Sequence, residues 1–227
     1  MNTFKKLISK IYVVILHLFY TIAWWSIFKK NIYKRFIFSG DDRYLTNHDL
    51  NSDSVVFEVG WYTWVFSDVI IQKYDCYMYI FEPVVEYYDI LENKYKNNPK
   101  IKIFNFGLSN KNEEIHIAKS LDWSSVFKQS WQYEIIQLVD FDTFISQEAI
   151  GDKKVDLISI NIEGGEYDLL ERILQTSPQM MQSIQVQFHD FVSNAQGKRD
   201  KILFLLEKNG YKKGYSFPFV WEFFTQK

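Results

Sequence analysis

The chain has 227 residues and a formal net charge of -2, with 47% hydrophobic and 19% aromatic residues. This length is enough for one domain with a sizeable core, and this composition excludes a disordered chain. The near-neutral charge gives no overall electrostatic basis for binding nucleic acid. The single cysteine, Cys76, excludes an internal disulfide, and no Cys/His group has the spacing of a zinc site.

The first distinct feature is an uncharged stretch at residues 11–28, from Ile11 to Phe28. As a helix it would reach roughly 27 Å, just short of a hydrocarbon core of about 30 Å. Lysines flank both ends, and Tyr20, Trp24 and Trp25 lie toward one end, as interfacial aromatics do. Two readings remain open: a membrane anchor or interfacial helix, and an accessory helix packed on the domain or in a dimer. The slight excess of basic residues after the stretch favours a cytoplasmic domain, associated with a membrane in the first reading.

The rest of the chain divides into three predicted segments. Residues 1–38 are hydrophobic and basic, residues 39–53 are a polar linker, and residues 54–227 form one α/β domain. In that domain, buried strands are predicted at 54–59, 76–81, 101–106, 155–162 and 183–188, and weaker ones at 114–118, 135–139, 211–216 and 219–225. Helices are predicted at 63–74, 84–97, 141–148, 167–175 and 198–209.

Buried strands that alternate with helices predict a parallel sheet covered by helices on both faces. The last two strands, joined by a short turn, add an antiparallel edge. In such sheets ligands bind outside the carboxyl ends of the strands, so these ends are the candidate site.

Two acidic residues close the first two strands. Glu58 is followed by Val59 and Gly60, and Glu82 comes 24 residues after Glu58, about one strand–helix–strand unit later. A carboxylate in the position of Glu82 can accept hydrogen bonds from two ribose hydroxyls. Because a dinucleotide phosphate needs several glycines and only Gly60 is present, NAD and FAD are disfavoured and S-adenosylmethionine is favoured.

The fourth and fifth buried strands also end in polar residues. Asn161, Glu163 and Glu166 surround a Gly-Gly turn, and His189 falls at the end of the fifth strand. We interpret Glu163 as functional and Glu166 as a helix N-terminal acid matched to the helix dipole. His189 is either a base or substrate partner, or a packed structural histidine.

These stretches together resemble the FkbM family of S-adenosylmethionine-dependent methyltransferases. The resemblance lies in "VFEVG" at 56–60, "FEP" at 81–83, "LVDFDTFI" at 138–145, "DLISINIEGGEYDLL" at 156–170 and "QFHDF" at 187–191. It implies a class I methyltransferase (Rossmann-like) three-layer sandwich, with a mostly parallel seven-stranded sheet and an antiparallel last strand. The hydrophobic N-terminal helix is additional to this domain.

The resemblance also implies a reaction and a set of site residues. It implies methyl transfer to oxygen, often on a sugar or small metabolite. It assigns Glu58 and Gly60 to the methionine end of S-adenosylmethionine and Glu82 to its ribose. Glu163 and His189 would face the methyl acceptor, and no metal is implied.

The turn after Gly60 departs from the family pattern, since Trp61, Tyr62 and Trp64 stand where small residues are usual. We therefore carry two functional hypotheses. The first is an O-methyltransferase acting on a hydroxyl of a sugar, glycan or small metabolite, with no nucleic-acid partner. The alternative is a catalytically inactive methyltransferase-like binding or scaffold protein, tethered to a membrane surface through Ile11–Phe28.

Overall fold

The structure, a computed structural model, describes residues 30–36, 38, 44–60, 66–118, 133–148 and 154–226. The chain divides into two compact units, Met1–Asp41 and Asp42–Lys227. In the first unit residues 30–36 are helical, whereas the hydrophobic stretch at 11–28 lies outside the described residues. Within the described ranges, no helix combines the length and the apolar character needed to cross a membrane.

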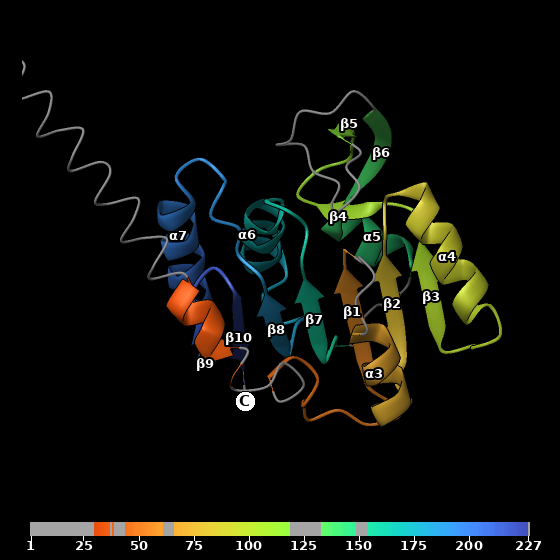
Figure 1. Cartoon of the computed structure of the whole chain (residues 1–227), viewed down its shortest axis with the longest axis horizontal. Coiled ribbons are helices and arrows are strands. Elements are labelled where there is room, and N and C mark those ends of the chain that lie inside the picture. The colour runs from red at the N-terminus through yellow and green to blue at the C-terminus, as the bar shows by residue number, and fades with distance from the viewer. Residues whose placement is uncertain are drawn as a thin grey trace, which may run out of the picture. The chain divides into compact units, whose positions relative to one another are not determined.

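The second unit is built on a seven-stranded sheet with the strand order β3-β2-β1-β7-β8-β10-β9 (Figure 1). The strands are β1 (Val55–Val59), β2 (Tyr77–Phe81), β3 (Ile101–Phe104), β7 (Leu157–Ile160), β8 (Ser183–Val186), β9 (Lys212–Phe217) and β10 (Trp221–Thr225). All neighbours from β3 to β8 pair in parallel, and β10 pairs antiparallel with both β8 and β9. The predicted mostly parallel sheet with an antiparallel last strand is therefore confirmed.

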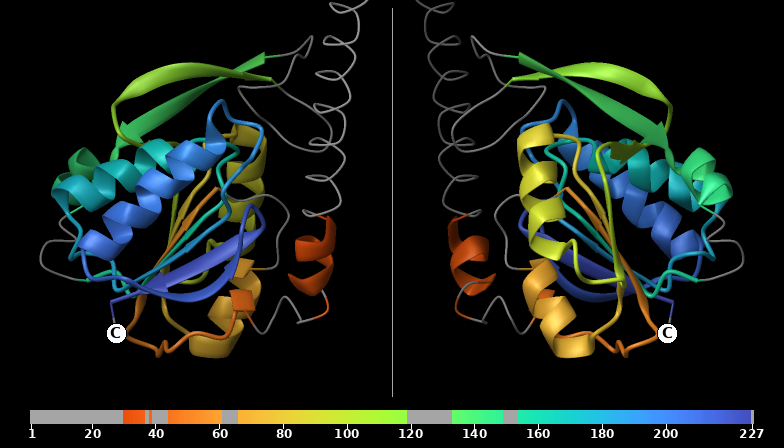
Figure 2. Two further views of the ribbon diagram at one scale, coloured as in Figure 1. Left: turned by 90° about the vertical axis from the view of Figure 1, so that its left-hand side faces the viewer. Right: turned by 90° about the vertical axis from the view of Figure 1, so that its right-hand side faces the viewer.

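In the described part of the chain, five helices cover the two faces of this sheet (Figure 2). They are α3 (Phe66–Tyr74) and α4 (Val85–Tyr95) on one face, and α5 (Phe141–Gln147), α6 (Glu166–Thr176) and α7 (Ala195–Lys208) on the other. Because successive strand residues point to opposite faces, Phe57 and Ile158 join the core under α5–α7, while Val56 and Leu157 join the core under α3. Burial on both faces explains why these strands are largely apolar.

A second sheet, β4-β6-β5, was not predicted as such. It consists of β4 (Gly107–Ser109), β5 (Glu113–Ala118) and β6 (Tyr133–Asp140), and it lies beyond the carboxyl ends of the main strands (Figure 1). The predicted strand at 101–106 is split, because β3 ends at Phe104 and the Asn105 side chain donates hydrogen bonds to the carbonyls of Glu82 and Pro83. Gly107 then starts a strand that pairs with β6.

Two further features of the core bear on stability. Arg199 on α7 is bound to Glu222 on β10 by two hydrogen bonds of 2.6 and 2.7 Å, and the Glu222 side chain is fully buried. Cys76, just before β2, is buried as predicted, and burial raises the pKa of its thiol to about 11.

Candidate active site

Glu58, at the end of β1, is buried on the sheet face that α3 covers. Its carboxyl group accepts a hydrogen bond from the hydroxyl of Ser67 in the first turn of α3. Burial raises the pKa of Glu58 to about 8, and the Ser67 hydrogen bond offsets only part of this effect. The carboxyl group is therefore largely protonated at neutral pH and braces β1 against α3.

The pKa of Glu58 predicts a pH-dependent effect of Glu58→Gln. Because the pKa is higher in the folded state, the contribution of this group to stability is complete below about pH 4.5 and is lost as the pH rises through about 8. Glutamine does not titrate. We therefore expect the free energy of unfolding of the variant, relative to that of the wild type, to increase across this pH window by an amount on the order of a few kcal/mol. Urea unfolding at about pH 5 and about pH 9 measures the difference. The same substitution at the exposed Glu86 is the matched control, and a pH-independent difference would contradict the assignment.

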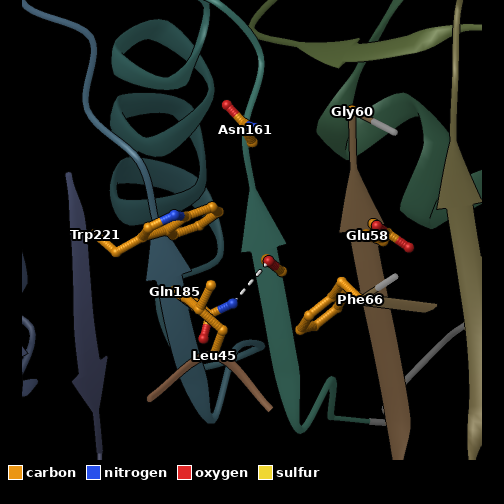
Figure 3. Close-up of a pocket in the computed structure, with 8 residues that line it drawn as sticks. Leu45, Glu58, Gly60, Phe66, Asn161, Gln185 and Trp221 are labelled. Atoms are coloured by element: carbon orange, nitrogen blue, oxygen red, sulfur yellow. Dashed lines mark hydrogen bonds between the residues drawn. The ribbon is translucent and has the colours of Figure 1, made fainter. Parts of the chain in front are cut away.

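Gly60 holds the ends of three strands together. Its backbone has φ +85°, and a Cβ at this position would lie 2.1 Å from the Asn161 carbonyl oxygen. Its N–H donates to the Phe81 carbonyl at 3.0 Å. Only glycine satisfies both the positive φ and this close approach. Figure 3 shows Gly60 and Asn161 at the ends of neighbouring strands above Glu58.

A small cavity lies below these two residues. It measures about 20 Å³ and is lined by Glu58, Ser159, Gln185 and Trp221 among others (Figure 3). This volume holds about one water molecule, so a ligand the size of S-adenosylmethionine would lie above the strand ends rather than in this cavity.

Glu82 occupies the carboxyl end of β2, as predicted. It is 3% exposed, and its Oε1 accepts a hydrogen bond of 2.8 Å from the Val84 N–H. The Asn105 side chain donates to the Glu82 carbonyl at 3.1 Å and so fixes the turn. The sequence-based reasoning missed Asn105, and no local pattern singles it out.

At the ends of β7 and β8, the structure brings Glu163, Glu166 and His189 together. Glu166 is fully buried and accepts hydrogen bonds from the N–H groups of Gly164 and His189, both at 2.8 Å. The imidazole of His189 places Nδ1 at 3.2 Å from Glu166 Oε1 and Nε2 at 3.5 Å from Glu163 Oε1. Glu166 thus does more than complement a helix dipole, because it ties the turn after β7 to the end of β8.

The charge of His189 follows from these contacts. Burial lowers its pKa, but the interactions with Glu163 and Glu166 outweigh burial and raise the pKa to about 9. At neutral pH His189 is therefore a cation between two carboxylates. An imidazolium donates hydrogen bonds through both nitrogens and does not accept a proton, so in this state His189 cannot serve as a base and Glu163 is the remaining one of the two predicted candidates.

The turn that carries Glu163 is strained and incompletely paired. Glu163 has φ +49°, in the left-handed region that non-glycine residues rarely adopt. Two buried polar atoms at this edge, Asn161 Oδ1 and Glu163 Oε2, have no hydrogen-bond partner among the described residues, and a third, His189 Nε2, makes the 3.5 Å ion pair with Glu163 Oε1 but no regular hydrogen bond. Since an unpaired buried polar group costs about 1–3 kcal/mol, such a group in a native fold calls for a functional explanation. The three atoms are therefore candidates for contact with a bound ligand.

The side chain of Phe191 borders this cluster. Its ring centroid lies 5.2 Å from that of His189, and the side chain is 47% exposed. Neither Phe191 nor Ser67 was singled out from the sequence, although Phe191 closes the "QFHDF" stretch. The aromatic turn residues Trp61, Tyr62 and Trp64 lie outside the described residues, as does most of the irregular segment 119–133. No group of three or more potential metal-ligating side chains occurs in the part of the chain that the structure describes.

The strand order 3-2-1-7-8-10-9, with acidic residues at the carboxyl ends of β1 and β2, defines a class I methyltransferase fold. The family model of the methyltransferase FkbM domain matches residues 47–213. The chain therefore belongs to the FkbM methyltransferase family, and the predicted resemblance is confirmed.

A solved structure from the same family supports the fold. The methyltransferase FkbM of Methylobacillus flagellatus KT superposes with a TM-score of 0.50 at 12% identity, over 78% of this chain and 44% of that chain. This chain thus spans less than half the length of that relative. The fibrillarin pre-rRNA processing protein of Methanococcus jannaschii gives a TM-score of 0.48 at 12% identity, over 79% of this chain and 69% of that one. No curated protein matches the sequence.

Proposed function

We propose that this protein is an S-adenosylmethionine-dependent O-methyltransferase acting on a hydroxyl of a sugar, glycan or small metabolite. The observation that supports the proposal is the trio of buried atoms Asn161 Oδ1, Glu163 Oε2 and His189 Nε2, which form no regular hydrogen bond with the described residues. They lie at the carboxyl edge of the sheet, where ligands of this fold bind.

The residues at this edge fit the cofactor. Asn161 Oδ1 is a buried acceptor without a donor, next to the tight turn at Gly60, and the ammonium group of S-adenosylmethionine is a matching donor. Glu82 would hold the ribose hydroxyls. When bound, the cofactor supplies an electrophilic methyl group on sulfur. Glu58 supports this edge from within, through its bond with Ser67.

The acidic cluster would bind and deprotonate the acceptor. The acceptor hydroxyl donates to Glu163 Oε2 and its proton passes to that oxygen, which turns the hydroxyl into a nucleophile. The His189 cation, held by Glu166 through Nδ1, directs Nε2–H toward Glu163 Oε1 and so fixes the orientation of Glu163. Holding the oxygen in line with the methyl group provides much of the acceleration.

The hydrogen-bonding character of the cluster supports a hydroxylated acceptor. His189 Nε2 is a donor, whereas Glu163 Oε2 and Asn161 Oδ1 are acceptors. A hydroxyl both donates and accepts, so it satisfies a neighbouring donor and acceptor at once. We therefore retain a hydroxylated small molecule or glycan as the acceptor in this proposal.

Calorimetric titration of the full chain with S-adenosylmethionine tests cofactor binding directly. We expect saturable binding that Glu82→Gln weakens by at least about 10-fold, because the substitution removes charge-assisted hydrogen bonds to the ribose. Glu86→Gln, on the exposed first turn of α4, is the control. A folded protein that does not bind the cofactor would refute the proposal.

The same titration bears on the alternative of a catalytically inactive binding or scaffold protein. The aromatic residues Trp61, Tyr62 and Trp64 after Gly60 favour that alternative, since bulky side chains stand where small ones are usual. Cofactor binding without methyl transfer to any hydroxylated acceptor in a broad panel would support it.

A further inference from the structure

A second cavity lies at the opposite edge of the main sheet from the candidate active site. It measures about 230 Å³. Asp156 and Leu157 border it where β7 starts, and Ser183 borders it where β8 starts. Asn161, Glu163 and His189 follow the other ends of the same two strands. The cavity is therefore separate from the cluster to which we assign methyl transfer.

Aromatic rings form much of the wall of this cavity. Tyr215 and Phe223 stack with centroids 5.6 Å apart, Tyr44 meets Tyr215 edge-on at 4.9 Å, and His48 lies 5.3 Å from Phe223. Aromatic faces carry negative charge in their π-systems and attract cations.

The charged groups in the wall have one sign. Asp49 and Asp156 line the cavity, and no lysine or arginine is among its lining residues in the described ranges. Lys73 is not a lining residue; its ammonium binds the Thr46 carbonyl and Asn47 Oδ1, although its charge still acts on His48. Burial lowers the pKa of His48, against the opposite effect of its hydrogen bond to the Leu45 carbonyl, so its ring adds no positive charge at neutral pH.

We propose that this cavity is a second ligand site that binds a small organic cation, such as an amine or a quaternary ammonium group. Rings and carboxylates together select a cation over an anion, and the rings favour one with apolar substituents over a hydrated metal ion. The volume lies below the roughly 300–1,000 Å³ of sites for drug-sized ligands, which limits the ligand to a few heavy atoms.

A buried hydrogen-bond chain connects this cavity with the carboxyl edge. Tyr215 donates to the Gln185 side chain at 2.9 Å, and Gln185 donates to Ser159 at 3.0 Å. Gln185 and Ser159 line the small cavity that also contains Glu58 and Gly60 (Figure 3). A cation bound against Tyr215 would thus contact a residue whose hydrogen bonds lead to the cofactor edge.

The test is an NMR titration of the isotope-labelled full chain, without S-adenosylmethionine, at constant ionic strength. Choline is the probe, and its neutral carbon analogue 3,3-dimethylbutan-1-ol is the matched control. We expect saturable shifts at Tyr215, Phe223 and Asp156, with choline binding at least about 10-fold more tightly than the alcohol.

Variants locate the site. Asp156 Oδ2 accepts a hydrogen bond from the Val55 N–H at 2.8 Å, and Asp156→Asn keeps an acceptor there, so the fold is retained. We expect Asp156→Asn and Asp49→Asn each to weaken choline binding by about 3-fold or more, as loss of a nearby charge predicts. Asp89→Asn, on the exposed side of α4, should leave it unchanged.

Three results would overturn the proposal. The first is equal affinity for choline and the neutral alcohol. The second is choline-induced chemical-shift changes confined to Asn161, Glu163 and His189. The third is an affinity for choline that neither Asp156→Asn nor Asp49→Asn changes. Because no methyl transfer is measured, a failure of the proposed enzymatic function would leave this result intact.

Discussion

Replacing Arg199 by alanine is expected to lower the free energy of unfolding by about 3–5 kcal/mol. The substitution leaves Glu222, which is fully buried, with Ser216 as its remaining side-chain donor at 2.9 Å. An unpaired buried carboxylate is strongly destabilising, whereas an exposed ion pair contributes about 0–1 kcal/mol. Urea unfolding of the full chain gives the difference.

Two further variants show whether the loss comes from the buried charge. Lys201→Ala, on the same helix, removes an ion pair with Glu171 in which the lysine is 56% exposed, and should cost less than about 1 kcal/mol. The double variant Arg199→Met with Glu222→Leu removes both charges and should recover most of the stability. A single Arg199→Ala variant as stable as Lys201→Ala would show that the pair is not energetically important.

Replacing Glu163 by glutamine is expected to lower methyl transfer by about 10²- to 10⁴-fold, the usual contribution of a general base. Glutamine preserves the shape and leaves the cofactor-binding residues in place, so affinity for S-adenosylmethionine should change by less than about 2-fold. Transfer of a tritiated methyl group to a panel of monosaccharides and uronic acids provides the assay. Glu171→Gln, a partly exposed acid on α6 that pairs with Lys201, is the control.

The pH dependence distinguishes Glu163 from His189 as the base. His189 is protonated below about pH 9 and loses its proton above it. Were His189 the base, activity would rise through this pH. With Glu163 as the base and the His189 cation as its orienting partner, activity should instead fall above about pH 9. Near-full activity of Glu163→Gln, or a rate that rises through pH 9, would reverse the assignment.

The sequence was sufficient to predict the main sheet and the placement of its strand ends. Glu58, Glu82 and His189 were expected at the carboxyl ends of buried strands, and they occupy or follow those ends. The reason is physical: strands buried on both faces are mainly apolar, so charged and polar residues gather near the ends of each run. The prediction of a tight turn after β1 rested on Gly60, where the backbone conformation requires a glycine.

The sequence did not predict features that arise from contacts between distant residues. The second sheet depends on the pairing of Gly107 with Leu138, and no local sequence pattern predicts that pairing. The charge of His189 depends on Glu166, which is 23 residues away along the chain. Histidine alone left the base and structural readings open, and only the positions of the two carboxylates distinguish them.

The single cysteine has a practical consequence. A buried thiol with a raised pKa reacts slowly with alkylating reagents, because the thiolate is the reactive species. A cysteine introduced on the surface, for example at Phe191 beside the candidate acceptor cluster, would therefore take up a fluorescent or spin label almost alone. Site-directed labels can thus be attached to the natural chain, and can follow ligand binding, without prior removal of Cys76.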